Sequence, residues 1–67
     1  MKKIIEEIVK KFKNEQIEVH HMLQMIDDAF IKKELERTVI IEERDECYIV
    51  EIRWKENNQN LNYTIAV

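Results

Sequence analysis

A chain of 67 residues is at most one small domain, and its 45% hydrophobic and 37% charged residues are typical of a globular protein rather than a disordered one. The single cysteine excludes an internal disulfide. The net charge of −3, from 11 basic and 14 acidic residues, lacks the basic excess of most nucleic-acid-binding proteins. A domain of this size buries only about 60% of its unfolded surface, so we expect oligomerisation or a partner protein to support it.

The sequence contains no apolar run long enough for a signal peptide or a membrane span, because Glu6 and Glu7 interrupt the apolar start of the chain. A cytoplasmic protein is expected, and the lone Cys47 agrees with a reducing compartment. Gly and Pro are absent. The abundance of Ile, Lys, Glu and Asn is typical of an AT-rich bacterial or phage genome.

Residues 2–13 predict an amphipathic helix whose apolar face carries Ile4, Ile5, Ile8, Val9 and Phe12. Lysines and glutamates alternate at i,i+4 spacing on the other face. A lysine patch for phosphate is one interpretation of that face. A solvated helix surface is favoured, because each interior lysine has a carboxylate one turn away.

Residues 17–35 predict a second helical segment with the apolar stripe Val19, Met22, Leu23, Ile26 and Phe30, while Ile31 and Leu35 lie off the stripe. Whether residues 2–36 form one helix or two is left open by the pattern. The stripe keeps its phase across residues 14–18, but Asn14 is suited to end one helix or cap the next. One helix of about 30 residues would be roughly 45 Å long and would overhang a seven-residue strand of roughly 23 Å. A break is therefore favoured.

Residues 47–67 predict a β-hairpin around an Asn57-Asn58 turn, since Asn tolerates the positive φ of a type I′ turn. The expected cross-strand pairs are Trp54–Leu61, Ile52–Tyr63, Val50–Ile65 and Tyr48–Val67. They place eight apolar side chains on one face, and a one-residue slip would turn one strand's set to the other face.

Residues 38–43 predict a first strand, joined to the hairpin by an Arg44-Asp45 turn. This turn pairs Val39 with Val50 and Ile41 with Tyr48, and it sets Glu43 beside Glu46, a like-charge pair. The expected fold is α+β in a single domain of residues 1–67. Helical residues 2–36 would cover the apolar face of a three-stranded antiparallel β-meander at 38–67.

The sequence shows no nucleophile–base spacing, no phosphate-binding loop and no metal cluster, so neither an enzyme nor a cofactor is expected. His20 and His21 are adjacent and would point about 100° apart on a helix, which does not chelate one metal. Cys47 has no nearby base. Trp54 and Tyr63 could stack on bases, but their register favours core packing.

The second face of the sheet is expected to gather a small apolar patch for partner binding, made by Ile40, Cys47, Ile49 and Ala66. The uncharged last strand, with Leu61, Thr64 and Ile65, predicts an unprotected edge for strand addition to a twin subunit or a partner. A second candidate is an acidic surface that would imitate phosphates, formed by Glu34, Glu36, Glu42, Glu43, Asp45 and Glu46.

These patterns favour a small non-enzymatic protein-interaction module that regulates or inhibits a partner protein and assembles as a homodimer. A phage- or mobile-element-encoded antagonist of a host defence or nucleic-acid-handling complex fits the size and acidity. The alternative is a small nucleic-acid-binding transcriptional regulator, with the lysine-rich first helix and Arg53 and Lys55 at the hairpin tip as contacts. Direct nucleic-acid binding is not favoured at this net charge, and no membrane association is expected.

Overall fold

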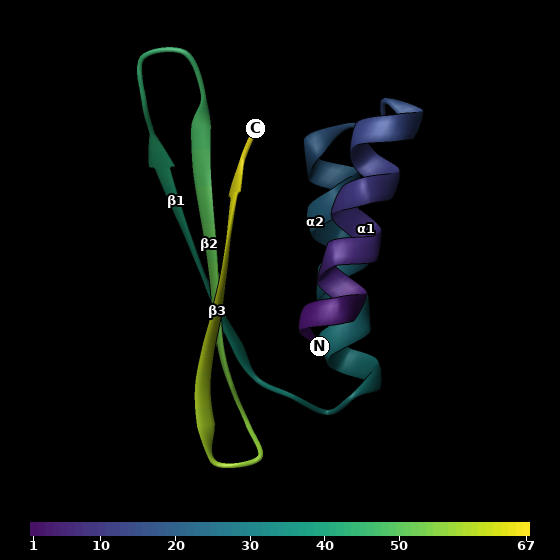
Figure 1. The fold of residues 1–67 in the computed structure, drawn as a ribbon, viewed down its shortest axis with the longest axis vertical. Helices are drawn as coiled ribbons and strands as arrows, with labels where there is room; N and C mark the ends of the chain where they lie inside the picture. Colours follow the sequence, from purple (N-terminus) through teal and green to yellow (C-terminus); the bar gives the residue numbers. More distant parts are fainter. The chain divides into compact units, whose positions relative to one another are not determined.

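Two helices precede three strands in the computed structural model, which describes residues 1–67 (Figure 1). The elements are α1 (Lys2–Glu15), α2 (Val19–Lys32), β1 (Arg37–Glu43), β2 (Tyr48–Glu56) and β3 (Gln59–Ala66). The strands form one antiparallel sheet in the order β1-β2-β3. The predicted α+β fold, an N-terminal helix pair with a three-stranded meander, is confirmed. The chain divides into two compact units, Met1–Glu34 and Leu35–Val67, which correspond to the helices and the sheet.

The helical segment breaks at Gln16, which adopts the left-handed conformation (φ 53°, ψ 43°) directly after α1. Left-handed residues commonly end helices, and Gly or Asn usually holds this place. The favoured break is therefore correct, but Asn14 neither ends α1 nor caps α2, because α1 continues to Glu15. Only Gln16 to Glu18 separate the helices, so α1 and α2 form a helical hairpin and contact each other.

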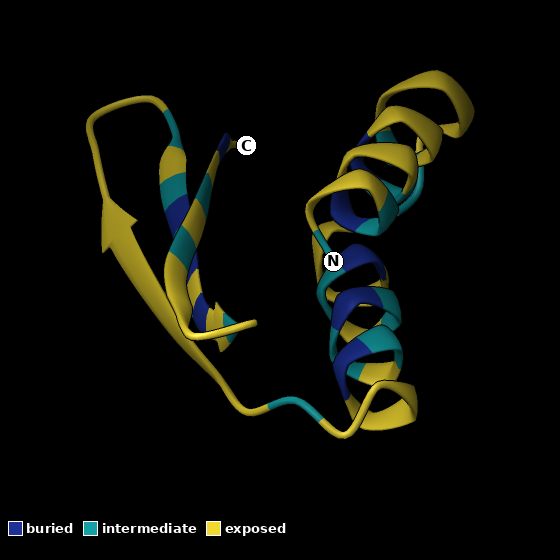
Figure 2. Cartoon of the chain, turned by 60° about the horizontal axis from the view of Figure 1, so that its bottom comes forward, coloured by how far each residue is buried: buried dark blue, intermediate teal, exposed yellow.

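Each helix buries one stripe, seen as dark blue in Figure 2. Residues four apart lie on one helix face, and Ile5 and Val9 of α1 are buried in this way. Met22, Ile26 and Phe30 are their counterparts in α2. Val19, predicted as part of the stripe, is exposed at the first position of α2.

The second helix is shorter than predicted, spanning Val19–Lys32 instead of residues 17–35. Its end is marked by backbone N–H groups of Lys33 and Glu34, which donate to Ala29 at 3.2 Å and Ile31 at 3.1 Å. Glu34 then takes a positive φ of 55°, which stops helix propagation. Ile31, off the predicted stripe, is 70% exposed.

The β2–β3 hairpin has the predicted register. Val50 pairs with Ile65, Ile52 with Tyr63 and Trp54 with Leu61. Tyr48 and Val67 exchange backbone bonds of 2.8 and 2.9 Å. Asn57 and Asn58 have φ of 53° and 63°, which is the geometry of the predicted type I′ turn.

The predicted β1–β2 register is wrong by two residues. Val39 pairs with Ile52 and Ile41 with Val50, and the Arg44 N–H donates to the Cys47 carbonyl at 2.8 Å. The turn is therefore centred on residues 45 and 46 instead of Arg44-Asp45. A two-residue shift leaves every side chain on its original face, so the apolar pattern does not select between the two registers. The observed register pairs Glu43 with Tyr48, which removes the like-charge contact with Glu46.

We call the two sides of the sheet the apolar face and the polar face. Four residues of the apolar face are buried: Val50, Ile52, Trp54 and Ile65. The polar face carries the alternate positions, among them Glu51, Arg53 and Thr64. Burial is confined to β2 and β3, because all seven residues of β1 are exposed, as the uniform yellow of that strand in Figure 2 shows.

Candidate interaction site

The outer edge of the sheet at β1 presents large aliphatic side chains to solvent on both faces. Val39 is 37% exposed, Ile41 56% and Ile40 39%. Val39 and Ile41 lie on the apolar face, and Ile40 lies on the polar face. Three consecutive exposed β-branched residues on an edge strand are unusual, because natural edges are generally protected from pairing by charge, proline or a bulge.

Backbone groups of β1 also point to the outer edge. Tyr48 and Val67 donate backbone hydrogen bonds to each other, so the N–H and C=O groups of Tyr48 point towards β3. Tyr48 and its register partner in β1, Glu43, are therefore a non-hydrogen-bonded pair. In an antiparallel ladder, bonded and non-bonded pairs alternate. The N–H and C=O groups of Val39 and Ile41, like those of Glu43, therefore point away from β2. A strand could be added there without breaking any bond of the sheet.

Tyr48 extends this exposed surface on the apolar face. Its side chain is 50% exposed, and its register partner Glu43 is two residues along β1 from Ile41. Sequence reasoning missed the surface of Val39, Ile41 and Tyr48, because it assigned all three to the core. Alternation shows which face is apolar, but it does not show how much of that face is covered.

The predicted contact residues fall on two different faces. Ile49 pairs directly with Ala66 on the polar face, and Ile40 is the diagonal neighbour of Ile49. Cys47 directly precedes β2; it is half-buried and its thiol is free. The strand register thus brings together three of the four residues predicted for the polar face, Ile40, Ile49 and Ala66, while Cys47 lies outside the paired strands. Among the three from the last strand, Thr64 is exposed, Leu61 is half-buried, and Ile65 is 2% exposed and belongs to the core.

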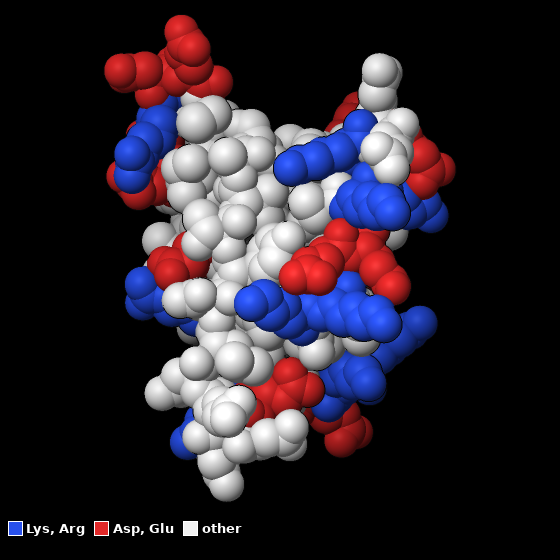
Figure 3. All heavy atoms as spheres, viewed as in Figure 1, with Lys and Arg blue, Asp and Glu red and all other residues white.

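The six predicted acidic residues are all exposed but do not form one surface. Four of them gather at the β1–β2 turn, where Figure 3 shows a group of acidic side chains; they are Glu42, Glu43, Asp45 and Glu46. Arg44 forms an ion pair with Glu42 at 3.2 Å and reduces the local negative charge. Glu36 lies at the other end of β1, about 23 Å away along a seven-residue strand. Glu34 belongs to the helical unit.

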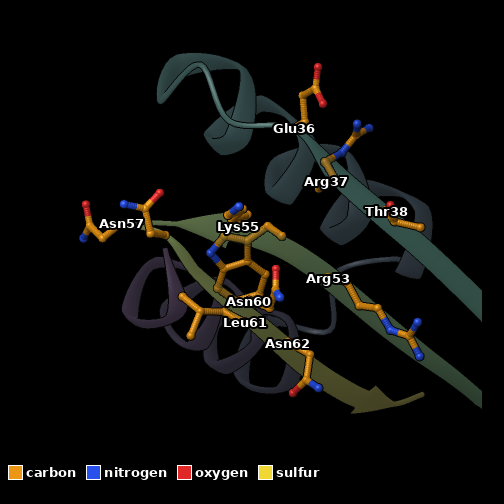
Figure 4. Close-up of a pocket in the computed structure, with 11 residues that line it drawn as sticks. Glu36, Arg37, Thr38, Arg53, Lys55, Asn57, Asn60, Leu61 and Asn62 are labelled. Atoms are coloured by element: carbon orange, nitrogen blue, oxygen red, sulfur yellow. The ribbon is translucent and has the colours of Figure 1, made fainter.

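A polar hollow of about 830 Å³ lies at the opposite end of the sheet from the acidic turn, and all three strands contribute to it (Figure 4). Its cations include Arg53 and Lys55, and four asparagines supply amide groups. Arg53 also bonds to Glu51 at 2.9 Å on the polar face. The lining residues are Glu36, Arg37, Thr38, Arg53, Trp54, Lys55, Asn57, Asn58, Asn60, Leu61 and Asn62. Such donors are suited to hydrogen-bond an anionic group, but no nucleophile and base are paired there.

Trp54 lines this hollow but offers little of its ring to a ligand, because it is only 5% exposed. Its indole Nε1–H donates to Glu56 Oε1 at 3.1 Å. The core packing favoured for Trp54 is therefore observed. Of the two aromatic residues predicted as a base-stacking pair, Tyr63 is half-buried and Trp54 is buried.

A second, apolar groove of about 370 Å³ lies within the helical unit. It is lined by Ile4 and Ile8 of α1, by Met25, Asp28, Ala29 and Lys32 of α2, and by Lys33. On the face of the helices seen in Figure 3, basic and acidic side chains are interleaved. This mixture matches the favoured solvated helix face more closely than a continuous basic patch.

The chemical groups singled out in the sequence remain dispersed. His20 and His21 are exposed, and His20 Nδ1 lies 3.2 Å from Glu18 Oε2. No three His, Cys, Asp or Glu side chains come close enough to hold a metal ion. Neither helix has the length and apolar content needed to cross a membrane. No known protein family matches this chain, and neither does any curated protein or solved structure.

Proposed function

We propose that this chain is a small non-enzymatic protein-interaction module whose β1 edge accepts a β-strand and which thereby regulates or inhibits a partner protein. The observation that carries the proposal is that every residue of β1 is exposed, including Val39, Ile40 and Ile41, together with backbone groups that point to the outer edge. In strand addition, main-chain hydrogen bonds supply affinity, and alternate side chains supply specificity.

The same mode is open at β3, the other edge of the sheet, which has no charged side chain. We favour β1 because its apolar side chains are exposed, whereas the largest aliphatic residue near the end of β3, Ile65, is already buried. Covering exposed apolar area stabilises a complex, whereas area that is already buried contributes nothing further to binding.

The acidic β1–β2 turn adjoins this edge and gives it a charge preference. Glu42, Glu43, Asp45 and Glu46 are suited to a basic surface, such as the nucleic-acid groove of a partner complex. An antagonist of a host defence or nucleic-acid-handling complex would present such a turn. The single free thiol agrees with work in a reducing compartment such as the cytoplasm.

The test compares proteins captured from the native host by the wild-type chain and by Ile41→Lys. A lysine at the outer edge should block strand addition and remove the specific partner. The matched control is Ile31→Lys, which places the same change at an exposed residue of α2. Capture that survives Ile41→Lys, or that both variants lose equally, would overturn the assignment to β1.

A second function, nucleic-acid binding, is favoured by one observation, the polar hollow with Arg53, Lys55 and four asparagines. Phosphate contacts release counterions, so such binding should weaken steeply as salt rises. Titration of the chain against duplex and single-stranded oligonucleotides at about 50 mM salt tests it. An affinity that Arg53→Ala and Lys55→Ala both reduce would support this function, and absence of binding at that salt would exclude it.

A further inference from the structure

We propose that the strand accepted by β1 is β1 of a second copy of this chain, paired antiparallel about a two-fold axis at Ile40. The inference rests on the proposed function, because it uses the same edge and names the partner. The pairing would join two three-stranded sheets into one continuous six-stranded sheet. A two-fold interface is isologous, so every contact occurs twice.

Hydrogen-bond geometry permits this pairing. The residues that turn their N–H and C=O groups to the outer edge are the odd-numbered ones, from Arg37 to Glu43. A two-fold axis at Ile40 sets odd residues opposite odd residues. Val39 then forms a hydrogen-bonded pair with Ile41 of the second copy, and Arg37 does so with Glu43. Ile40 meets its own copy in a non-hydrogen-bonded pair on the axis.

Charge is complementary in this register at both ends of the strand. Arg37 is opposite Glu43 of the second copy, and one residue further out, Glu36 is opposite Arg44. The Glu-Arg pair that precedes the aliphatic run therefore faces the Glu-Arg pair that follows it, in reverse order. Cross-strand pairs of opposite charge stabilise a sheet, whereas directly opposed like charges destabilise it.

The neighbouring registers lose this match. Moving the axis to Val39 sets Glu36 opposite Glu42, a like-charge pair. Moving it to Ile41 sets Ile40 opposite Glu42 and Val39 opposite Glu43, so that aliphatic residues face carboxylates. Only the axis at Ile40 pairs the aliphatic run with itself.

This register also keeps like faces together. Val39 and Ile41 of each copy lie on the apolar face, beside the half-exposed Tyr48. On the polar face, Ile40 of one copy contacts Ile40 of the other. Side chains across the new strand pair thus contact one another on both faces of the sheet, which shields part of the apolar area of β1 that the single chain leaves in water.

Disulfide cross-linking of single-cysteine variants in a Cys47→Ser background tests this register directly. Non-hydrogen-bonded pairs hold their Cα atoms about 4.5 Å apart, within the range of a disulfide. Ile40→Cys should therefore form a covalent dimer under oxidised glutathione, seen on a non-reducing gel. Thr38→Cys and Glu42→Cys should each stay largely monomeric on that gel alone, but an equimolar mixture of the two should form the mixed dimer.

Other outcomes would overturn the inference. Cross-linking of Thr38→Cys with Ile40→Cys would place the axis at Val39, and cross-linking of Ile40→Cys with Glu42→Cys would place it at Ile41. Equal cross-linking of all variants and mixtures would show random collision. Either of the first two results would show β1 pairing in a different register, and the third would show no specific pairing through β1.

Light scattering separates this inference from the proposed function. A monomer near 8.2 kDa at about 100 μM would overturn self-pairing. If that monomer still captures a protein that Ile41→Lys loses and Ile31→Lys retains, the edge accepts a strand from another protein and the proposed function stands. A monomer that also captures no protein dependent on Ile41 would overturn both proposals.

Discussion

Four residues other than glycine adopt positive φ in this chain, which contains no glycine at all: Gln16, Glu34, Asn57 and Asn58. The left-handed conformation costs most residues roughly 1–2 kcal/mol, and Asn is the ordinary residue that tolerates it best. The two asparagines therefore form a turn at little cost. Gln16 and Glu34 carry strain at the ends of the two helices, and this strain predicts where glycine would stabilise the protein.

Replacing Gln16 by glycine should raise the free energy of unfolding by about 0.5–1 kcal/mol, because glycine meets no Cβ clash at φ 53°. Urea unfolding followed by circular dichroism measures the change. The control is Gln24→Gly, within α2, which should lower the free energy of unfolding by about 1 kcal/mol. Opposite signs for one substitution would confirm the left-handed helix end, and equal destabilisation would contradict it.

Asn58→Gly should also stabilise the chain, by about 0.5 kcal/mol, since Asn-Gly is the preferred type I′ turn. The same change at Asn62, an exposed position within β3, should destabilise by about 0.5–1 kcal/mol through lost backbone entropy. Thermal unfolding of both variants at one protein concentration compares them. A stabilised Asn62→Gly with a destabilised Asn58→Gly would contradict the turn assignment.

Among the elements, the central strand β2 bears most of the sheet's burial. Its positions alternate between the two faces, and Val50, Ile52 and Trp54 are buried while Arg53 and Lys55 are exposed. The first strand, although equally aliphatic in its centre, is exposed at every position. Side chains of the same type therefore contribute very different amounts to stability.

Ile52→Ala should lower the free energy of unfolding by about 2–5 kcal/mol, because Ile52 is fully buried and its truncation leaves a cavity. A domain of this length is stable by roughly 3–10 kcal/mol, so the variant would be partly unfolded near 37 °C. Ile31→Ala, at a residue 70% exposed, should change stability by no more than about 0.5 kcal/mol. Denaturant unfolding monitored by Trp54 fluorescence measures both, and equal losses would contradict the core described above.

On the scale of the whole molecule, the chain has 67 residues, no disulfide and one edge strand, β1, with no buried residue. Small domains commonly gain stability from oligomerisation. If two copies pair through β1, folding and assembly share one equilibrium, and stability depends on the concentration of the chain.

Raising the chain concentration from about 1 to 100 μM should raise the midpoint of thermal unfolding by roughly 5–10 °C for a dimer that unfolds as it dissociates. Ile41→Lys should abolish this dependence, whereas Ile31→Lys, exposed on α2, should retain it. Scanning calorimetry at several concentrations tests the expectation. A wild-type midpoint that does not move with concentration would contradict a stabilising dimer.

Much of the candidate site follows from alternation along the chain. The grouping of Ile40, Ile49 and Ala66 on the polar face needs only the period of two and the strand registers. The exposure of Val39, Ile41 and Tyr48 does not follow, because they alternate like core residues. A sequence signal existed in the Glu-Arg pairs that flank the aliphatic run of β1, at residues 36–37 and 43–44.

The sequence by itself determined the α+β order of elements, the apolar face of each element and the register of β2 with β3. A slip of that register by one residue would bury polar side chains, and Asn57 and Asn58 place the turn, so local chemistry left no alternative. Only the tertiary structure decided the helix break at Gln16, the two-residue shift between β1 and β2, and the exposure of β1. The alternative arrangements keep the same side chains on the same faces of each element. They differ in which residues pair and in how far each face is buried, and a pattern of apolar residues does not specify either.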